Sequence, residues 1–164
     1  MTLNIRIYGT KYANICGDMI SKAISGFFVQ KWSECGVSYL KADKMPIHDR
    51  GPVSEPNFVL ICDLIEVDKS ALKNLPRECV VIINTQEKSA PLVLKKQRIK
   101  TILIDATGIA MTHTSEPNPV VPMIAALVKK TNDISLKNFE AMLKQISPKD
   151  GSIAAAEEAH KLVR

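Results

Sequence analysis

Short apolar runs alternate with amphipathic stretches along most of the chain. Residues 3–8 are mainly apolar and end at Gly9, which predicts a first strand followed by a turn. An amphipathic stretch from about residue 18 to residue 29 predicts a helix, and residues 36–40 predict a second short strand. Residues 41–56 contain several prolines and a glycine, so we expect them to be mostly loop.

Two later runs are apolar at every position, at residues 58–62 and 79–83. Such continuous runs are typical of strands that are buried on both faces of a parallel sheet. Between them, Asp68 precedes a short amphipathic segment that ends before Pro76. An aspartate in that position favours a short capped helix, which would serve as the crossover between the two strands.

The second half of the chain continues the alternation of strands and helices. The predicted elements are a strand at 99–104, a helix from Asp105 to about residue 111, a helix at 120–130, a helix at 138–146 and a helical tail at 152–164. The tail is rich in alanine and has few large apolar residues, so we expect it to fold only against a partner.

This order of elements predicts an α/β fold, a three-layer, doubly wound, mostly parallel sheet flanked by helices. The chain has 164 residues, of which 46% are hydrophobic, enough for one core and a single domain. We predict that domain at residues 1–147 and a C-terminal helical tail at 148–164. Ligands of such sheets gather at the carboxyl ends of the strands, which makes the loop after the first strand the expected site.

The net charge of +5 is mildly basic and favours an acidic partner or an anionic ligand. The basic residues are scattered except for a cluster at 95–100, which we interpret as a solvated edge in preference to a phosphate-binding stripe. No nucleic-acid role is indicated, because the cluster lacks interleaved aromatic residues. The N-terminus reads as a strand and no apolar run approaches a membrane span. We therefore expect a cytoplasmic protein with free thiols and no membrane association.

The loop after the first strand carries the candidate ligand residues Gly9, Thr10, Lys11 and Asn14. Lysine stands at the second glycine position of a dinucleotide fingerprint and asparagine at the third, so that motif is absent. The loop could still present backbone N–H groups and the charge of Lys11 to a ligand. The alternative is a structural turn that faces a partner protein, with Tyr12 as a packing residue.

No catalytic residue and no metal site can be named from the sequence. The four cysteines are 17 or more positions apart, which gives no Cys-x-x-Cys pair for zinc or an iron–sulfur cluster. None of the three histidines stands in a pattern with a nucleophile or a metal ligand, and we expect them on the surface or in loops. An independent enzyme is therefore the least favoured class.

Seven segments in the same order resemble the gamma component of pyruvate and related 2-oxoacid:ferredoxin oxidoreductases, over nearly the whole chain. They include the first strand with its opening glycine, a Pro-Ile pair that follows a strand, and an Ala-Thr-x-Ile-Ala helix start. In order, they are residues 5–9, 33–36, 38–47, 55–60, 83–85, 105–110, and Asn118 with 123–127. The family's glycine-rich loop is replaced by residues 10–14, so only Gly9 carries over from that motif.

The resemblance implies a non-catalytic subunit in a complex with alpha, beta and delta subunits. Thiamine diphosphate would sit between alpha and beta, and iron–sulfur clusters would lie in beta and delta. This chain would bind no cofactor alone, and its role would be assembly and shaping of the active site, with coenzyme A as a candidate ligand. The competing hypothesis is a stand-alone Rossmann-like module that binds a small anion such as coenzyme A or a nucleotide. In isolation the chain could also form a homo-oligomer.

Overall fold

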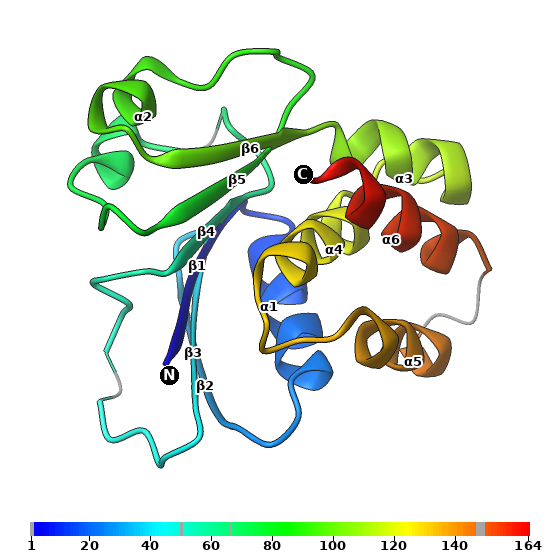
Figure 1. Cartoon of the computed structure of the whole chain (residues 1–164), viewed down its shortest axis with the longest axis horizontal. Helices are drawn as coiled ribbons and strands as arrows, with labels where there is room; N and C mark the ends of the chain where they lie inside the picture. The colour runs from blue at the N-terminus through cyan, green and yellow to red at the C-terminus, as the bar shows by residue number, and fades with distance from the viewer. Residues whose placement is uncertain (1, 50, 66, 147–149) are drawn as a thin grey trace.

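Six strands form one open sheet in the order β2-β3-β1-β4-β5-β6. This computed structural model describes residues 2–49, 51–65, 67–146 and 150–164, and Figure 1 shows helices on both faces of the sheet. The strands are β1 (Leu3–Tyr8), β2 (Phe28–Glu34), β3 (Val37–Asp43), β4 (Phe58–Ile61), β5 (Val80–Asn84) and β6 (Lys100–Ile104). The helices are α1 (Ala13–Ala23), the 3-10 helix η1 (Lys69–Leu72), α2 (Leu92–Gln97), α3 (Ala106–Thr114), α4 (Val120–Lys130), α5 (Leu136–Ile146) and α6 (Asp150–Leu162).

Strands β1, β4, β5 and β6 run parallel, whereas β3 pairs antiparallel with β1, and β2 antiparallel with β3. The first strand is therefore the point where the winding of the sheet reverses, with β4 on one side and the β2–β3 hairpin on the other. The predicted α/β fold, a single domain with a mostly parallel sheet flanked by helices, is confirmed.

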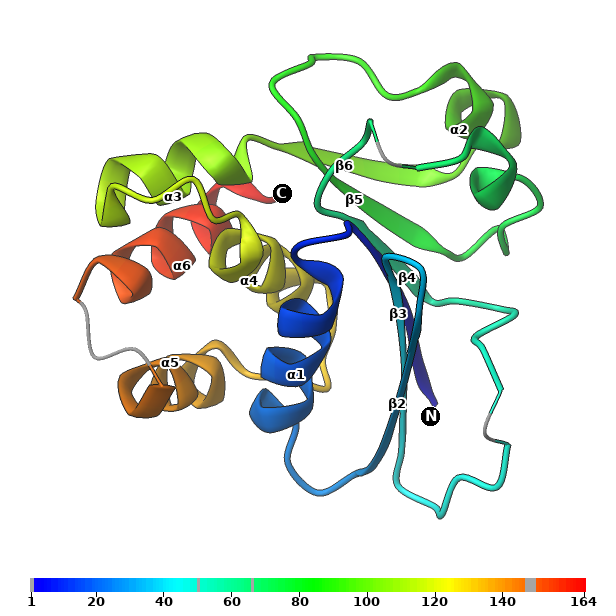
Figure 2. The same cartoon turned by 180° about the vertical axis from the view of Figure 1, so that it is seen from behind.

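The two faces of the sheet carry layers of different thickness. Helices α1, α3, α4, α5 and α6 lie on one face, and only η1 and α2 lie on the other (Figures 1 and 2). Successive side chains of a strand point to opposite faces, so Ile82 packs into the thick layer while Val81 and Ile83 pack into the thin one. The continuous apolar runs of β4 and β5 are explained by burial on both sides.

The predicted helix at residues 18–29 is wrong in both boundaries. Helix α1 begins at Ala13, and the chain leaves it at Ile24 in an extended conformation (φ −80°, ψ 128°). Residues 28–34 form β2 instead, an edge strand in which the Trp32 ring lies 5.1 Å from the Tyr39 ring of β3. The apolar residues at 27–29 continue the helical spacing by chance, but Phe28 and Val29 pair with the end of β3.

A tight turn joins β2 to β3, and β3 is longer than the second strand predicted from the sequence. Cys35 and Gly36 both have positive φ, 43° and 79°, as the two central residues of a type I′ hairpin turn require. Because the hairpin pairs along its full length, β3 continues to Asp43 rather than ending at residue 40.

The two predicted aspartate caps, Asp105 and Asp68, are confirmed. The Asp105 carboxylate accepts a hydrogen bond from the Gly108 N–H at 2.8 Å, and the Asn118 side chain accepts one from the Val120 N–H at 3.1 Å. Asp68 accepts from the Ser70 N–H at 2.9 Å and starts the short 3-10 helix η1. These side chains satisfy N–H groups that have no partner within the helix.

Helix α6 packs against α3 and α4, so the alanine-rich C-terminal segment finds its packing partner within the chain. Ala155, Ala156 and Ala159 are at most 1% exposed and belong to the same core as the sheet. His113 of α3 lies 2.5 Å from the Glu158 carboxylate of α6. The predicted boundary at residue 147 lies outside the described residues, and the division into domain and tail stays a prediction.

Replacing Ala156 with leucine should lower the free energy of unfolding by about 1–3 kcal/mol, because added methylenes overpack a closed helix interface. Urea unfolding followed by circular dichroism measures this change. Glu157→Leu, at the neighbouring exposed position, is the control and should shift the free energy by less than about 0.5 kcal/mol. Equal unfolding midpoints for the two variants would show that α6 is not closely packed.

Candidate functional site

The four parallel strands end at one edge of the sheet, and the segments that follow them meet there (Figure 1). Gly9 follows β1, Cys62 follows β4, Asn84 ends β5 and Asp105 follows β6. This edge includes the reversal point beside β1, where ligands of open α/β sheets bind. The predicted site residues therefore lie at the expected edge.

Gly9 is held in close contact on two sides. Its N–H donates to the Gly36 carbonyl oxygen at 3.0 Å, and its own carbonyl oxygen accepts from Ala13 at 2.8 Å at the start of α1. At φ +140°, a Cβ atom on Gly9 would lie 3.0 Å from the Cβ of Cys62. The turn is thus closed by packing and by its own hydrogen bonds, and it does not form an open main-chain cradle.

The three other predicted residues are exposed, and only two of them lie together. Thr10 and Asn14 line a hollow of about 120 Å³ whose opposite wall is the turn of the β2–β3 hairpin, residues 33–37. A Cβ atom on Gly36 would come within 3.0 Å of the Thr10 hydroxyl oxygen, so the hairpin packs closely on the loop. Lys11 does not line this hollow.

Asn84 ties the ends of β4 and β5 to the start of α3. Its side-chain N–H groups donate to the Cys62 carbonyl oxygen and to the Thr107 hydroxyl, both at 2.9 Å. Its side-chain oxygen accepts from the Thr107 N–H at 3.2 Å. Asn84 therefore makes three hydrogen bonds that hold β4, β5 and the start of α3 in place.

Two buried thiols lie beneath the turn. Hydrogen bonding with Cys62 and full burial raise the pKa of the Cys16 thiol well above its ordinary value. Burial also raises the pKa of Cys79 to about 11. The Cys16 and Cys79 thiols are therefore protonated at neutral pH and have no nucleophilic thiolate to offer.

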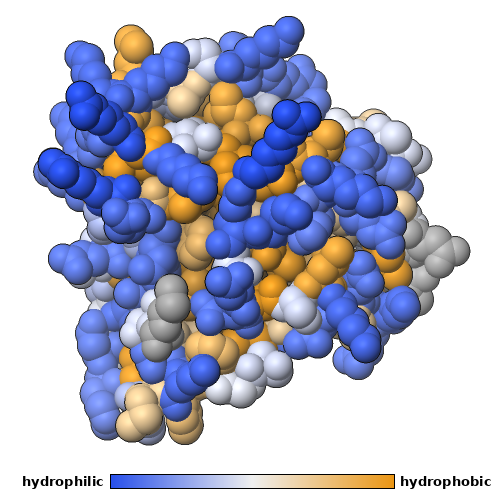
Figure 3. All heavy atoms as spheres, viewed as in Figure 1, coloured by the Kyte–Doolittle hydropathy of each residue, from blue (hydrophilic) through white to orange (hydrophobic). Residues whose placement is uncertain are grey.

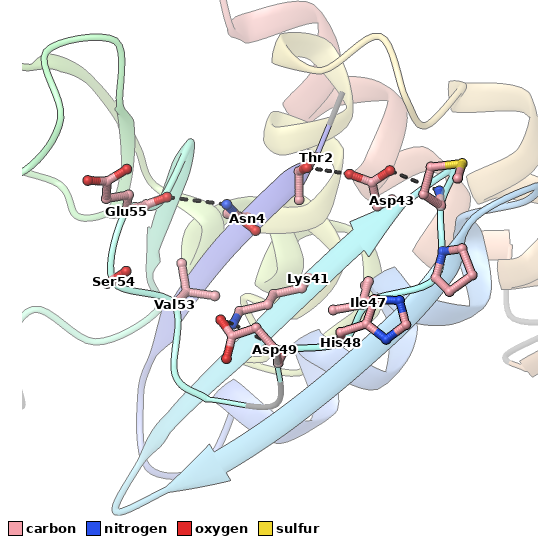
Figure 4. Close-up of a pocket in the computed structure, with 12 residues that line it drawn as sticks. Thr2, Asn4, Lys41, Asp43, Ile47, His48, Asp49, Val53, Ser54 and Glu55 are labelled. Carbon is pink, nitrogen blue, oxygen red and sulfur yellow. Dashed lines mark hydrogen bonds and ion pairs between the residues drawn. The ribbon is translucent and has the colours of Figure 1, made fainter.

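A second hollow, of about 450 Å³, lies at the opposite edge of the sheet between β1, β3 and the loop 44–55 (Figure 4). The Lys41 side chain, only 11% exposed, points to Asp49 and forms an ion pair of 2.6 Å. Arg6 holds the loop against the sheet by donating to the Val53 carbonyl oxygen at 2.6 Å. Sequence analysis predicted only loop here, because no local pattern pairs a strand lysine with a loop aspartate.

Carboxylates outnumber cations in this second hollow. Asp43, Asp49 and Glu55 line it together with Lys41 and His48. The Thr2 hydroxyl and the Met45 N–H lower the pKa of Asp43, and the hydrogen bond from Lys41 lowers the pKa of Asp49. Both aspartates are therefore ionised at neutral pH, which disfavours an anionic ligand in this hollow.

Within the described ranges, no group of three or more histidine, cysteine, aspartate or glutamate side chains is arranged to hold a metal ion. No helix of that part of the chain is long and apolar enough to cross a membrane.

The fold and the site define a class of protein, an open α/β domain. At the carboxyl ends of its parallel strands, where such folds bind ligands, the turn after β1 is closed by backbone and amide contacts. The chain belongs to the pyruvate ferredoxin/flavodoxin oxidoreductase family, whose sequence profile matches residues 27–164. Several of the relatives that it resembles are common gamma subunits of pyruvate/ketoisovalerate oxidoreductases.

Relatives and solved structures agree with this assignment. The pyruvate/ketoisovalerate oxidoreductases common subunit gamma of Pyrococcus abyssi is 28% identical over 134 residues, covering 74% of this chain and 71% of the relative. The pyruvate oxidoreductase subunit PORC of Thermotoga maritima superposes with a TM-score of 0.81 at 19% identity, covering 99% of this chain and 97% of that one. The 2-oxoglutarate:ferredoxin oxidoreductase of Magnetococcus marinus superposes with a TM-score of 0.73 at 16% identity, covering 98% of this chain but 30% of that longer one.

Gly9→Ala should destabilise the fold, because the new methyl group meets Cys62 in a backbone conformation that side chains rarely adopt. Gly26→Ala is the matched control, since Gly26 has φ +78° but open space around its Cβ position. We expect Gly9→Ala to cost about 1–3 kcal/mol more than the control, the usual penalty of overpacking. Equal losses in urea unfolding would argue that the turn is not closed.

Acid should remove stability contributed by Asp43 and Asp49. Their pKa values are lowered on folding, so the unfolded chain binds more protons. The contribution is complete above the ordinary aspartate pKa of about 3.9 and is lost as the pH falls through the lower folded values. Urea unfolding between neutral and acidic pH should show a shallower acid loss for Asp43→Asn/Asp49→Asn than for the control Glu78→Gln/Glu87→Gln. Identical slopes would contradict this.

Proposed function

We propose that this chain is the gamma-type subunit of a 2-oxoacid:ferredoxin (acceptor) oxidoreductase complex, with a role in assembly and in shaping the active site. The complex would decarboxylate a 2-oxoacid oxidatively to an acyl-CoA. The observation that carries the proposal is the family match over residues 27–164. The closed turn at Gly9 supports a structural role, because its main-chain groups are used in contacts within the chain.

The partners in this proposal are the alpha, beta and delta subunits. Thiamine diphosphate and iron–sulfur clusters would be held by those partners. The turn after β1 does not fit a diphosphate, because the Gly9 N–H already donates to Gly36 and Lys11 lies outside the adjacent hollow. Coenzyme A stays a candidate ligand of the complex, since the related 2-oxoglutarate:ferredoxin oxidoreductase of Magnetococcus marinus has coenzyme A bound.

A stand-alone module for a small anion is not favoured. The hollow beside Thr10 has a volume of about 120 Å³, and the larger hollow around Lys41 is lined by more carboxylates than cations. A coenzyme A or nucleotide phosphate would meet like charge in the larger hollow. We place the complex in the cytoplasm, a proposal that the four free cysteines support.

Purification of the tagged chain from its native host tests the proposal. We expect larger chains to copurify with it, bringing thiamine diphosphate and the visible absorbance of iron–sulfur clusters, and the assembly to reduce a viologen dye when a 2-oxoacid and coenzyme A are supplied. Recovery of the chain as a monomer or homo-oligomer, without other chains, under gentle low-salt conditions would contradict the proposal. An unrelated tagged protein of similar charge serves as the control for adventitious capture.

A further inference from the structure

The net charge of the molecule is concentrated in one part of the thin layer. Residues 67–100 contain eight basic and three acidic residues, a net charge of +5, which equals the net charge of the whole chain with its 22 basic and 17 acidic residues. All eight basic side chains are exposed. They are Lys69, Lys73, Arg77, Lys88, Lys95, Lys96, Arg98 and Lys100. The remainder of the protein is therefore neutral, and the field of the molecule comes from the surface around η1 and α2.

An apolar hollow of about 290 Å³ lies in the same layer, between η1 and α2. Six of its seven lining residues are apolar, and the seventh is Lys69. The lining residues are Leu64, Val67, Lys69, Leu72, Pro91, Leu92 and Val93. The Leu92 side chain stays 72% exposed beside it, and nearby Ile65 is 94% exposed. Figure 3 shows long hydrophilic side chains around hydrophobic ones at this corner, at the upper left of the view.

The hollow has fixed walls. The Gln97 side chain of α2 donates to the Leu72 carbonyl oxygen of η1 at 2.7 Å and to the Val93 carbonyl oxygen at 3.0 Å. Its oxygen accepts from the Leu75 N–H at 3.3 Å. One half-buried amide thus clamps η1 to α2, so a ligand side chain would enter a preformed space and little ordering would be needed on binding.

We propose that this basic and apolar face, made of residues 64, 65 and 67–100 around η1 and α2, docks an acidic segment of a partner protein that inserts an apolar side chain into the hollow. The inference rests on the proposed function as a subunit, and it names the surface that the partner uses. Charge complementarity selects an acidic partner, and the aliphatic hollow selects a leucine-sized anchor. A solvated edge accounts for the lysines but leaves the exposed Leu92 and Ile65 unexplained. Nucleic acid fits poorly, because no aromatic residue lines the hollow.

Two variants separate the charge from the anchor. Lys69→Glu/Lys73→Glu/Lys96→Glu reverses three exposed charges, and Leu92→Ser removes apolar surface from the rim of the hollow. The matched control, Lys22→Glu/Lys137→Glu/Lys144→Glu, reverses three exposed lysines on α1 and α5, in the other layer. Each variant is mixed with the partner subunits at two salt concentrations, and the affinity of association is measured. In parallel, the isolated full chain is titrated with three probes: a mixed glutamate–leucine peptide, polyglutamate and duplex DNA.

The charge variant should weaken association by about tenfold or more and reduce its salt dependence. Leu92→Ser should weaken it by about fivefold with the salt dependence kept, and the control should bind within about twofold of the parent. Normal association of both test variants would overturn the docking face while leaving the subunit function intact. If the parent joins no complex, the proposed function fails. In that case the docking face is still supported if the glutamate–leucine peptide binds more tightly than polyglutamate and the test variants lose that binding. The docking face is contradicted if the peptide does not bind or if duplex DNA binds more tightly.

Discussion

The close approach of three backbone segments at Gly9 is the constraint on which the sheet depends. The residue stands where the winding of the sheet reverses, against Cys62 after β4 and against the hairpin turn at Gly36. A side chain at this position would separate β1 from one neighbour or the other. The same closeness engages the Gly9 N–H and carbonyl oxygen in hydrogen bonds within the chain. The close packing at the edge where related folds bind ligands thus favours a role in contacts with other subunits over a role in ligand binding.

The molecule divides its tasks between its two layers. The thick layer of five helices buries most of the core, including the alanine interface of α6. Residues 67–100, which include η1 and α2 of the thin layer, carry a net charge equal to that of the whole protein. The proposed docking face therefore lies opposite the layer that holds the larger core. A subunit that works by contact can change its charged layer without disturbing the core.

The sequence was sufficient to predict the elements whose signals are local. Strands β4 and β5 have continuous apolar runs, and helix α3 begins at a capping aspartate. Strand β2 was missed because it is an exposed edge strand. It has no buried face that would require apolar and polar residues to alternate along it. Gly9 could be placed at the ligand edge from the sequence. The Lys41–Asp49 pair could not, because it joins a strand to a loop that only the tertiary fold brings together.

The hairpin between β2 and β3 bears on the kinetics of folding. Its two-residue turn brings partners together across a minimal loop, whereas the parallel pairs of β1 with β4 and of β4 with β5 each close a loop of a dozen or more residues. Closing the hairpin therefore costs the least chain entropy of any pairing in the sheet. Since Gly9 bonds to the tip of this hairpin, the hairpin can fix the register of the central strand once it has formed.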